Sequence, residues 1–319
     1  MRGAGAGDVT WLSESEVASI LRGLATENSN LGTPADEGQF SLPGALAKVA
    51  LRWDPKRKRW GRPSGRAATT HILKPPRTGI PFHCENEHLC LELARELGLD
   101  SARSSILTVE DQTVLSVIRY DREIVARSVV RVHQEDMSQA LGVDPDLKDA
   151  AQGAPTLSQI VGLLREWSPR AIEESLQLFQ AIAYNWAIAG TDAHPRNYSV
   201  LIRSGNLVSL APLYDIASSL LIHRTVPKVK PETWRLAMAV GGYTTIGEID
   251  REAWFDEARR SGLRTNLVLE RVGETVSAIP DAADRVAARA VSEGVDDAFA
   301  ERFVREIRAQ SAKRLASLR

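Results

Sequence analysis

Residues 177–216 read QLFQAIAYNWAIAG, then TDAHPRNYSVLI, then RSGNLVSLAPLYDI, and this stretch decides the fold. The first part predicts an apolar helix ending at Gly190, because glycine is common just past a helix C-terminus. A polar loop follows, and two short apolar runs around Ser204-Gly205-Asn206 predict a hairpin. Asp215 comes just past the second run. The expected order is helix, glycine, polar loop, hairpin and a second aspartate.

The polar loop places Asp192 and Asn197 with four residues between them. Protein kinases use this spacing, because one carboxylate must accept the proton of the attacking hydroxyl while oxygen ligands hold Mg²⁺ against the triphosphate. Asp215 would supply the charged metal ligand. Asp and Asn are also common turn formers after a helix. The spacing alone favours a simple turn, whereas the whole ordered set favours phosphoryl transfer.

The composition indicates a soluble globular protein of two lobes or domains. The chain has 319 residues, of which 43% are hydrophobic and 25% charged. A net charge of −1 and a pI of about 6.6 argue against an extended nucleic-acid surface, though not against a local basic patch. Two cysteines make no disulfide framework, and the start lacks the apolar core of a signal peptide. We expect a cytoplasmic protein.

The first part of the chain is rich in predicted strands. Ser13 and Glu16 fit a capping box at the start of a helix. Residues 40–53 predict a strand, a Pro-Gly turn and a second strand. The run of four basic residues 56–59 predicts a hairpin tip, for which solvated charge is the favoured interpretation and a nucleic-acid or acidic-partner contact the alternative.

Lys74 lies near the end of a predicted strand, in the position where kinases place a lysine that pairs with nucleotide phosphates. Glu87, in the next predicted helix, could reach Lys74 or could be an acid favoured by the helix macrodipole. The nearby cysteine and histidine residues do not predict zinc, because their offsets on a helix point in different directions. They are His83, Cys84, His88 and Cys90.

The second part of the chain is mostly helical. Helices are expected at 157–166, 170–189, 251–262 and 281–317, the last broken near Gly294. Strands first and helices later predict an α+β, bilobal protein-kinase-like fold. Its small strand-rich N-lobe would take residues 1–120 and its larger, mostly helical C-lobe residues 121–319.

Several segments together resemble the HipA-like serine/threonine kinases, the toxin components of bacterial toxin–antitoxin pairs. The segments are FSLPGALAK, TTHILKPP, NEHLCLELARELGL, RYDR, RVHQEDMSQALG, GTDAHPRNYSV and LAPLYDI. They occur in family order over roughly residues 13–275. The TDxHxxN and YDI segments are specific together.

The resemblance implies an ATP- and Mg²⁺-dependent protein kinase with assigned site residues. Asp192 would be the catalytic base, and Asn197 and Asp215 the Mg²⁺ ligands. The implied nucleotide-binding residues are Pro43, Gly44, Ala45, Leu46, Ala47 and Lys48 in a glycine loop; Lys74 on the phosphates; Ile118, Arg119 and Tyr120 at the adenine hinge; Asp121 near the ribose; and His194, Arg196, Asn197, Tyr214 and Asp215 around the phosphates. Ser41 matches the family's autophosphorylated serine, and a phosphate there would repel nucleotide phosphates.

The chain departs from the family pattern at four positions. Leu46 and Ala47 replace Gln and Glu in the glycine loop, Ile118 replaces a hinge Glu, and Arg196 replaces the usual Lys. From the resemblance we expect a protein without the family's N-terminal subdomain of about 100 residues, as in the shorter, HipT-like members where it is a separate protein.

The implied substrate is a protein, an aminoacyl-tRNA synthetase in family members. The implied partners are a helix-turn-helix antitoxin and a protein resembling the N-terminal subdomain. The kinase would contact DNA only indirectly, through the antitoxin, and no membrane partner is expected. The sequence also leaves open a small-molecule kinase and an inactive pseudokinase that acts as a binding module. A metal-dependent hydrolase built on Asp192, His194 and Asp215 is the least favoured, because no second ligand cluster accompanies it.

Overall fold

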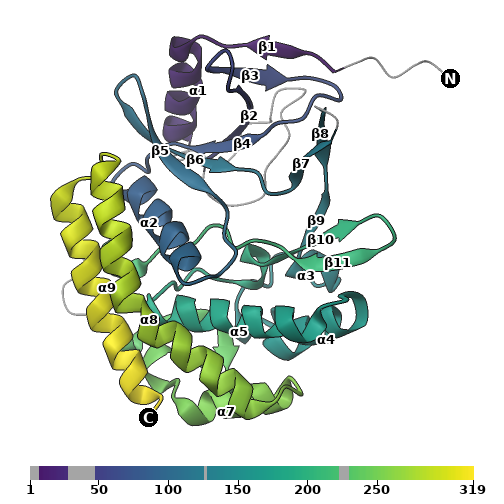
Figure 1. Cartoon of the computed structure of the whole chain (residues 1–319), viewed down its shortest axis with the longest axis vertical. Helices are drawn as coiled ribbons and strands as arrows, with labels where there is room; N and C mark the ends of the chain where they lie inside the picture. Colours follow the sequence, from purple (N-terminus) through teal and green to yellow (C-terminus); the bar gives the residue numbers. More distant parts are fainter. Residues whose placement is uncertain (1–6, 28–46, 126–127, 223–229) are drawn as a thin grey trace. The chain divides into compact units, whose positions relative to one another are not determined.

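The computed structural model of the chain describes residues 7–27, 47–125, 128–222 and 230–319, and Figure 1 draws the others as a grey trace. The backbone divides into two compact units. Unit 1 takes in Met1–His88 and Ala102–Val132, as far as they are described, and unit 2 takes in Leu89–Ser101 and His133–Arg319. The predicted functional boundary between residues 120 and 121 stays a prediction.

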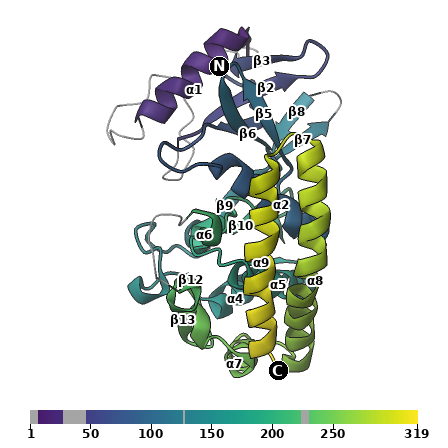
Figure 2. The same cartoon turned by 90° about the vertical axis from the view of Figure 1, so that its left-hand side faces the viewer.

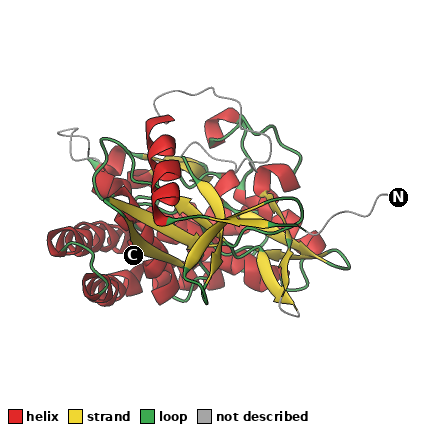
Figure 3. Ribbon diagram, turned by 90° about the horizontal axis from the view of Figure 1, so that it is seen from above, coloured by secondary structure: helices red, strands yellow, loops and turns green. Residues whose placement is uncertain are grey.

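Unit 1 is built on an antiparallel sheet, to which its described residues contribute six strands in the order β1-β3-β2-β4-β6-β5. Figure 3 distinguishes these strands from the helices by colour. The strands are β1 (Val9–Trp11), β2 (Val49–Asp54), β3 (Arg59–Pro63), β4 (His71–Lys74), β5 (Ser104–Val109) and β6 (Gln112–Ile118). The hairpin of β7 (Arg122–Val125) and β8 (Ser128–Arg131) follows. Strand-rich character was thus predicted correctly for this part of the chain.

Helix α1 (Glu14–Glu27) packs against one face of this sheet. The predicted capping box is confirmed, because the Ser13 amide donates to the Glu16 carboxylate at 2.7 Å and the Glu16 amide donates to the Ser13 hydroxyl at 3.2 Å. Buried apolar side chains of the helix and strands form the core of unit 1. They are Leu12, Val17, Ala18, Leu21, Leu51, Leu73, Val109 and Val114.

Helix α2 (His83–Glu96) carries the chain from unit 1 into unit 2. It begins four residues before Glu87, and Gly98, with φ +79°, follows its end. The first turns face unit 1, where the Cys84 thiol approaches the carbonyl of Lys74. The last turns belong to unit 2, so one helix contributes buried residues to both units.

Unit 2 is mostly helical, as predicted. Its longer helices are α4 (Leu157–Trp167), α5 (Ala171–Ala187), α7 (Arg251–Arg260), α8 (Thr265–Ser292) and α9 (Asp297–Ser317), and its short ones are α3 (Met137–Ala140) and α6 (Ser219–Ile222). Figures 1 and 2 show α8 and α9 side by side over most of their length. The buried aromatic rings of Phe179, Trp186 and Trp254 join α5 to α7.

One helix boundary was predicted wrongly. Helix α8 begins at Thr265 rather than near residue 281, and it continues through Pro280. Val268, Val272, Val276 and Ile279 form a fully buried stripe before that proline. The packing of this stripe supplies the free energy that keeps a proline inside the helix, which would otherwise cost about 3 kcal/mol.

Two small antiparallel sheets complete the described part of unit 2. Strand β10 (Ser199–Arg203) lies between β9 (His133–Asp136) and β11 (Leu207–Leu210), and β12 (Arg235–Val240) pairs with β13 (Tyr243–Thr245). The predicted hairpin around Ser204-Gly205-Asn206 is confirmed, and both Gly205 and Asn206 have positive φ. Among the residues that the structure describes, no helix has the length and apolar character of a bilayer-spanning segment.

Candidate active site

The loop that carries Asp192 begins where α5 ends, and its start differs from the prediction. Ala189, not Gly190, takes the left-handed conformation just past the helix, with φ +53°. Gly190 is required for a different reason: a Cβ at this position would lie 2.4 Å from Oδ1 of Asn185, one turn back on α5. The glycine therefore lets the loop leave the helix directly over a buried side chain.

The loop folds back so that Asn197 meets Asp192. The amide of His194 donates to the Asp192 carbonyl at 2.8 Å, and the Asn197 carboxamide Nδ2 donates to the same carbonyl at 2.8 Å. A single 3₁₀ turn, η2 (Pro195–Asn197), starts with the proline. Because Nδ2 is used inside the loop, Oδ1 is the atom of Asn197 that can bind a cation.

Asp215 is returned to this loop by the β10–β11 hairpin. It has φ +54°, a conformation that non-glycine residues rarely adopt and that clusters at functional sites. Asp215 and Asn197 line one small depression together with Tyr214 and Asn185. The structure therefore brings the two predicted Mg²⁺ ligands to the same place.

The Asp192 carboxyl lies at the surface of unit 2, close enough to Asp215 to interact electrostatically. Loss of hydration to the surrounding loop raises the pKa of Asp192; His194 opposes this shift and the Asp215 carboxylate reinforces it. A carboxylate whose pKa is raised accepts a proton more readily, as a general base requires.

Tyr214 joins the catalytic loop to the segment that carries Asp215. Its hydroxyl lies 2.6 Å from the Ser199 hydroxyl and donates to the Arg196 carbonyl at 2.8 Å. Burial raises the pKa of Tyr214 well above its ordinary value, so the hydroxyl keeps its proton. Tyr214 thus braces the catalytic loop against the segment that carries Asp215, and its predicted contact with the nucleotide stays a prediction.

Arg196 and His194 take different positions around the loop. The Arg196 guanidinium donates to the Pro145 carbonyl at 3.1 Å and lies 3.8 Å from the Asp136 carboxylate. The Nδ1 atom of His194 is buried and has no hydrogen-bond partner in the described residues. Contacts of either side chain with nucleotide phosphates stay a prediction.

Asn185 is a site-supporting residue that sequence reasoning did not single out. It is 3% exposed, and its Nδ2 donates to the Ala181 carbonyl and to the Tyr198 hydroxyl, at 3.1 and 2.9 Å. Tyr198 directly follows Asn197, so this amide fixes the end of the loop from inside the helix. An asparagine among the apolar residues 181–190 was the available signal.

The unit 2 residues fit a Mg²⁺ ion that is bound together with a nucleotide. Mg²⁺ takes oxygen ligands and is usually held by one or two carboxylates while waters and phosphates fill the other positions. Asp215 supplies a carboxylate and Asn197 a carboxamide oxygen. No cluster of three or more His, Cys, Asp or Glu side chains suited to a metal occurs within the described ranges, and this nucleotide-assisted mode does not require one.

Unit 1 contains the predicted pair of Lys74 and Glu87. Lys74 Nζ lies 2.6 Å from a Glu87 carboxylate oxygen, and both residues are at most 5% exposed. Of the two roles considered for Glu87, the structure supports the pairing with Lys74. Breaking a buried ion pair by removing one partner costs about 3–5 kcal/mol, so the lysine is held firmly in its position.

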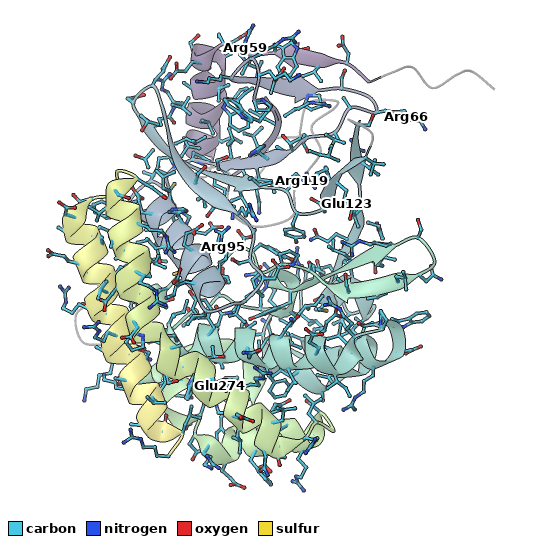
Figure 4. The ribbon with its side chains drawn as sticks, viewed as in Figure 1. Arg59, Arg66, Arg95, Arg119, Glu123 and Glu274 are labelled. Atoms are coloured by element: carbon cyan, nitrogen blue, oxygen red, sulfur yellow. The ribbon has the colours of Figure 1, made fainter. Side chains whose placement is uncertain are left out.

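The segment predicted as the adenine hinge is tied into unit 1. The amides of Ile118 and Arg119 donate to the carbonyls of Arg103 and Thr70, at 2.8 and 2.9 Å. Figure 4 labels Arg119, whose guanidinium makes two hydrogen bonds to Asp121, at 3.0 and 2.7 Å.

The carboxylate of Asp121 also accepts a hydrogen bond of 2.7 Å from Arg122. Burial opposes ionisation, but the Arg119 and Arg122 guanidiniums outweigh it and lower the pKa of Asp121. A ribose hydroxyl at the predicted position would have to bind a carboxylate that already accepts hydrogen bonds from Arg119 and Arg122. Tyr120 lies between these residues, and its predicted contact with adenine is untested.

Part of the predicted nucleotide site lies outside the described residues. This applies to Ser41 and to Pro43, Gly44, Ala45 and Leu46 of the glycine loop. Ala47 and Lys48 are described and lead directly into β2. Their roles stay predictions.

Comparison with known proteins identifies the family. The HipA-like C-terminal domain matches residues 40–283, which is most of the chain. The chain belongs to this family.

Relatives and solved structures agree with this placement. A candidate kinase of Sinorhizobium fredii, Y4mE, is 36% identical over 279 residues, which is 87% of this chain and 63% of Y4mE. The serine/threonine-protein kinase toxin HipA of Shewanella oneidensis is 25% identical over 264 residues, which is 76% of this chain and 56% of the toxin. The chain thus spans less than two thirds of the length of these relatives.

The fold is also that of solved structures in two bacterial systems. A chain from the Shewanella oneidensis complex of HipA, HipB and operator DNA matches with a TM-score of 0.78 and 20% identity, over 99% of this chain and 74% of its own length. The Helicobacter pylori proinflammatory kinase CtkA matches with a TM-score of 0.57 and 11% identity, over 90% of this chain and 95% of CtkA. The predicted α+β, kinase-like fold is confirmed.

Proposed function

We propose that this HipA-like chain is an ATP- and Mg²⁺-dependent serine/threonine protein kinase and the toxin of a bacterial toxin–antitoxin system. The observation that carries the proposal is the convergence of Asp192, Asn197 and Asp215 in unit 2. Asn197 is hydrogen-bonded to the Asp192 backbone, and it lines one depression with Asp215. Phosphoryl transfer requires a base and oxygen ligands for a metal in one place.

Each group in unit 2 has a separate task in this proposal. Asp192 accepts the proton of the attacking serine or threonine hydroxyl, and its raised pKa suits that role. Asp215 and the Oδ1 atom of Asn197 hold Mg²⁺, which neutralises charge on the transferred phosphoryl group. Tyr214 holds the Arg196 carbonyl and so keeps the turn before Asn197 in place.

The groups of unit 1 bind the nucleotide. Lys74, oriented by Glu87, pairs with phosphate oxygens. Residues Ala47 and Lys48, with the glycine loop that precedes them, approach the phosphates, and the backbone around Tyr120 receives adenine. Phosphorylation of Ser41 would add negative charge beside the loop and inhibit ATP binding.

Family membership motivates the proposed substrate and partners. The substrate class is a translation component such as an aminoacyl-tRNA synthetase. The antitoxin is a helix-turn-helix protein, by analogy with the solved HipA complex, which includes HipB and operator DNA. A separate protein resembling the N-terminal subdomain would be a further partner.

The proposal is tested by incubating the purified chain with labelled ATP, Mg²⁺ and a bacterial lysate, beside Asp192→Asn. The wild type should label itself or a lysate protein, and the variant should lose at least 100-fold of that rate, about 2.7 kcal/mol of transition-state stabilisation. Glu173→Gln is a matched control, because this carboxylate lies exposed on α5 away from the loop.

Other outcomes separate the alternatives. Labelled metabolites without labelled protein would indicate a small-molecule kinase. Thermal stabilisation by ATP without turnover would indicate a pseudokinase. Either result would refute the protein-kinase proposal.

A further inference from the structure

Most cations in the most basic part of the chain have no role in the proposed kinase chemistry, which uses only Lys48 and Lys74 among them. Residues 48–77 contain ten Lys and Arg residues and one acidic residue, Asp54, although the whole chain has a net charge of −1. We use the name basic hairpin for residues 52–62 of β2, β3 and their connection. Its exposed cations are Lys56, Arg57, Lys58, Arg59 and Arg62; Figure 4 labels Arg59.

Asp54 organises the tip of the basic hairpin. Its Oδ1 accepts hydrogen bonds from the amides of Lys56 and Arg57, at 2.9 and 3.2 Å. Lys58 completes the turn with φ +48°. The one carboxylate in the segment is thus engaged by the backbone, and the tip holds its cations in an ordered turn rather than on a free chain.

Most of these cations have no strong counter-charge. Arg57 has Asp54 at 3.9 Å and is 62% exposed, while Lys56, Lys58 and Arg62 form no ion pair with the described residues. Hydrogen bonds from Ser13 are the main cause of the lowered pKa of Glu16, and the charges of Arg59 and Arg62 lower it to a smaller extent. The surface therefore keeps a strong net positive charge.

The tip of the basic hairpin extends a short way past the strands that flank it. On one side, β1 pairs with β3 only as far as Gly61, and on the other β4 pairs with β2 only as far as Leu51. Beyond these points, Trp53 pairs with Trp60 and Asp54 with Arg59. The Trp60 carbonyl still accepts from the Leu12 amide and the Trp53 amide donates to the Thr70 hydroxyl, both at 2.9 Å, so within the described residues only the Asp54–Arg59 pair and its turn extend past the flanking segments. A two-stranded ribbon has the width that the major groove of B-form DNA admits, whereas the major groove of A-form RNA is too narrow.

The chemistry of the tip argues against other anionic partners. A membrane surface would call for exposed apolar side chains, and none of the large exposed ones in the described residues lies on the hairpin. A single strand would call for open aromatic faces. Trp60 packs on the unit 1 core and against Trp53, and the Arg57 guanidinium lies 5.6 Å from the Trp11 ring centre.

We propose that the basic hairpin is a docking surface for duplex DNA, which it binds through backbone phosphates in or beside the major groove. This surface would add a direct DNA contact to any contact made through an antitoxin. Neither the kinase chemistry nor its residues enter the proposal, so it stands or fails independently of the proposed function.

The test measures binding of the full chain to a fluorescent 20-base-pair DNA duplex by anisotropy, between 50 and 200 mM salt. The variant replaces Lys56, Lys58 and Arg62 by Gln. Each lost phosphate contact reduces the slope of log affinity against log salt by about 0.9, so the variant's slope should be about 2–3 smaller. Its affinity at 100 mM salt should fall about 10- to 100-fold.

A control variant separates local contact from bulk charge. Lys230, Arg235 and Arg264 are exposed residues of unit 2 and form no ion pair in the described part of the chain; replacing them by Gln removes the same charge. This control should bind DNA like the wild type. Equal slopes for the wild type and the hairpin variant would overturn the proposal, and so would equal losses in both variants.

Two further probes decide the class of partner. Polyglutamate stands in for an acidic protein, and phosphatidylserine vesicles stand in for a membrane. Both should bind at least 10-fold more weakly than the duplex at 100 mM salt. Binding to either probe as tight as to DNA would overturn the assignment to DNA.

Discussion

Replacing Gly190 by alanine should disturb the catalytic loop through Asn185. The new Cβ would lie 2.4 Å from Asn185 Oδ1, so the buried carboxamide must turn away. Turning it breaks the hydrogen bonds of Nδ2 to the Ala181 carbonyl and the Tyr198 hydroxyl. At about 0.5–1.5 kcal/mol for each hydrogen bond, the expected destabilisation is about 1–3 kcal/mol.

A double-mutant cycle makes this reasoning quantitative. Asn185→Ala alone removes the amide that donates to Tyr198 and should cost about 1–2 kcal/mol. In the Asn185→Ala/Gly190→Ala chain the clash is absent, so the pair should cost little more than Asn185→Ala. The coupling energy should therefore be about 1–3 kcal/mol, whereas independent sites add within about 0.5 kcal/mol.

Hydrogen exchange is the suitable assay, because a chain of two compact units need not unfold in one two-state step. Opening free energies would be measured in peptides that cover residues 181–200, and labelled-ATP turnover would be measured on the same samples. Gly162→Ala on α4 is the matched control, because its Cβ would meet nothing within 4 Å. Additive effects of the two substitutions would refute the close approach of Asn185 and Gly190.

The other predictions concern Tyr214, the Lys74–Glu87 ion pair and the half-buried His71. Tyr214→Phe removes the hydroxyl that holds the Arg196 carbonyl. Loss of this hydrogen bond costs about 1 kcal/mol, so the Mg²⁺ concentration for half-maximal turnover should rise about 3- to 10-fold. Tyr243→Phe, at an exposed position, should leave that concentration unchanged. Lys74→Met should lower kcat/KM for ATP at least 100-fold, about 2.7 kcal/mol, and a rate equal to the wild type would exclude Lys74 from ATP binding. Burial lowers the pKa of His71 to about 4, from an ordinary 6.5. Because the folded state favours neutral His71, its contribution to the free energy of unfolding should be fully present above pH 6.5. The free energy of unfolding should then fall by about 1–3 kcal/mol as the pH drops toward 4. His71→Gln should reduce this loss in thermal melts, and an unchanged pH dependence would contradict the shift.

Local sequence signals predicted the parts of the fold that depend on neighbouring residues. The Ser13 and Glu16 capping box fixed the start of α1, and Gly205-Asn206 supplied the positive φ angles of a tight hairpin. Pairing of Lys74 with Glu87 was one of the two roles predicted for Glu87, and the structure has this pair. It could be predicted because the end of a strand and the helix that follows it can both be located from sequence. In each case the two residues lie close together in the sequence, or their proximity follows from the order of strands and helices.

Features that depend on tertiary packing were missed or misplaced. Gly190 was taken as the helix terminator, but Ala189 carries the left-handed φ, and position 190 needs a glycine because a Cβ there would collide with Asn185. The start of α8 was placed after Pro280, because the valine stripe that sustains the helix is informative only once its packing partners are known.

The central claim is the division of labour between Asp192 and Asp215, and it is tested most directly by measuring ATP affinity and phosphoryl transfer with and without Mg²⁺. Asp192→Asn should bind ATP with Mg²⁺ as tightly as the wild type and fail to transfer phosphate. Asp215→Asn should lose the Mg²⁺-dependent part of ATP binding as well as transfer. The account would be contradicted if Asp192→Asn transferred phosphate at the wild-type rate, or if Mg²⁺ strengthened ATP binding equally in both variants.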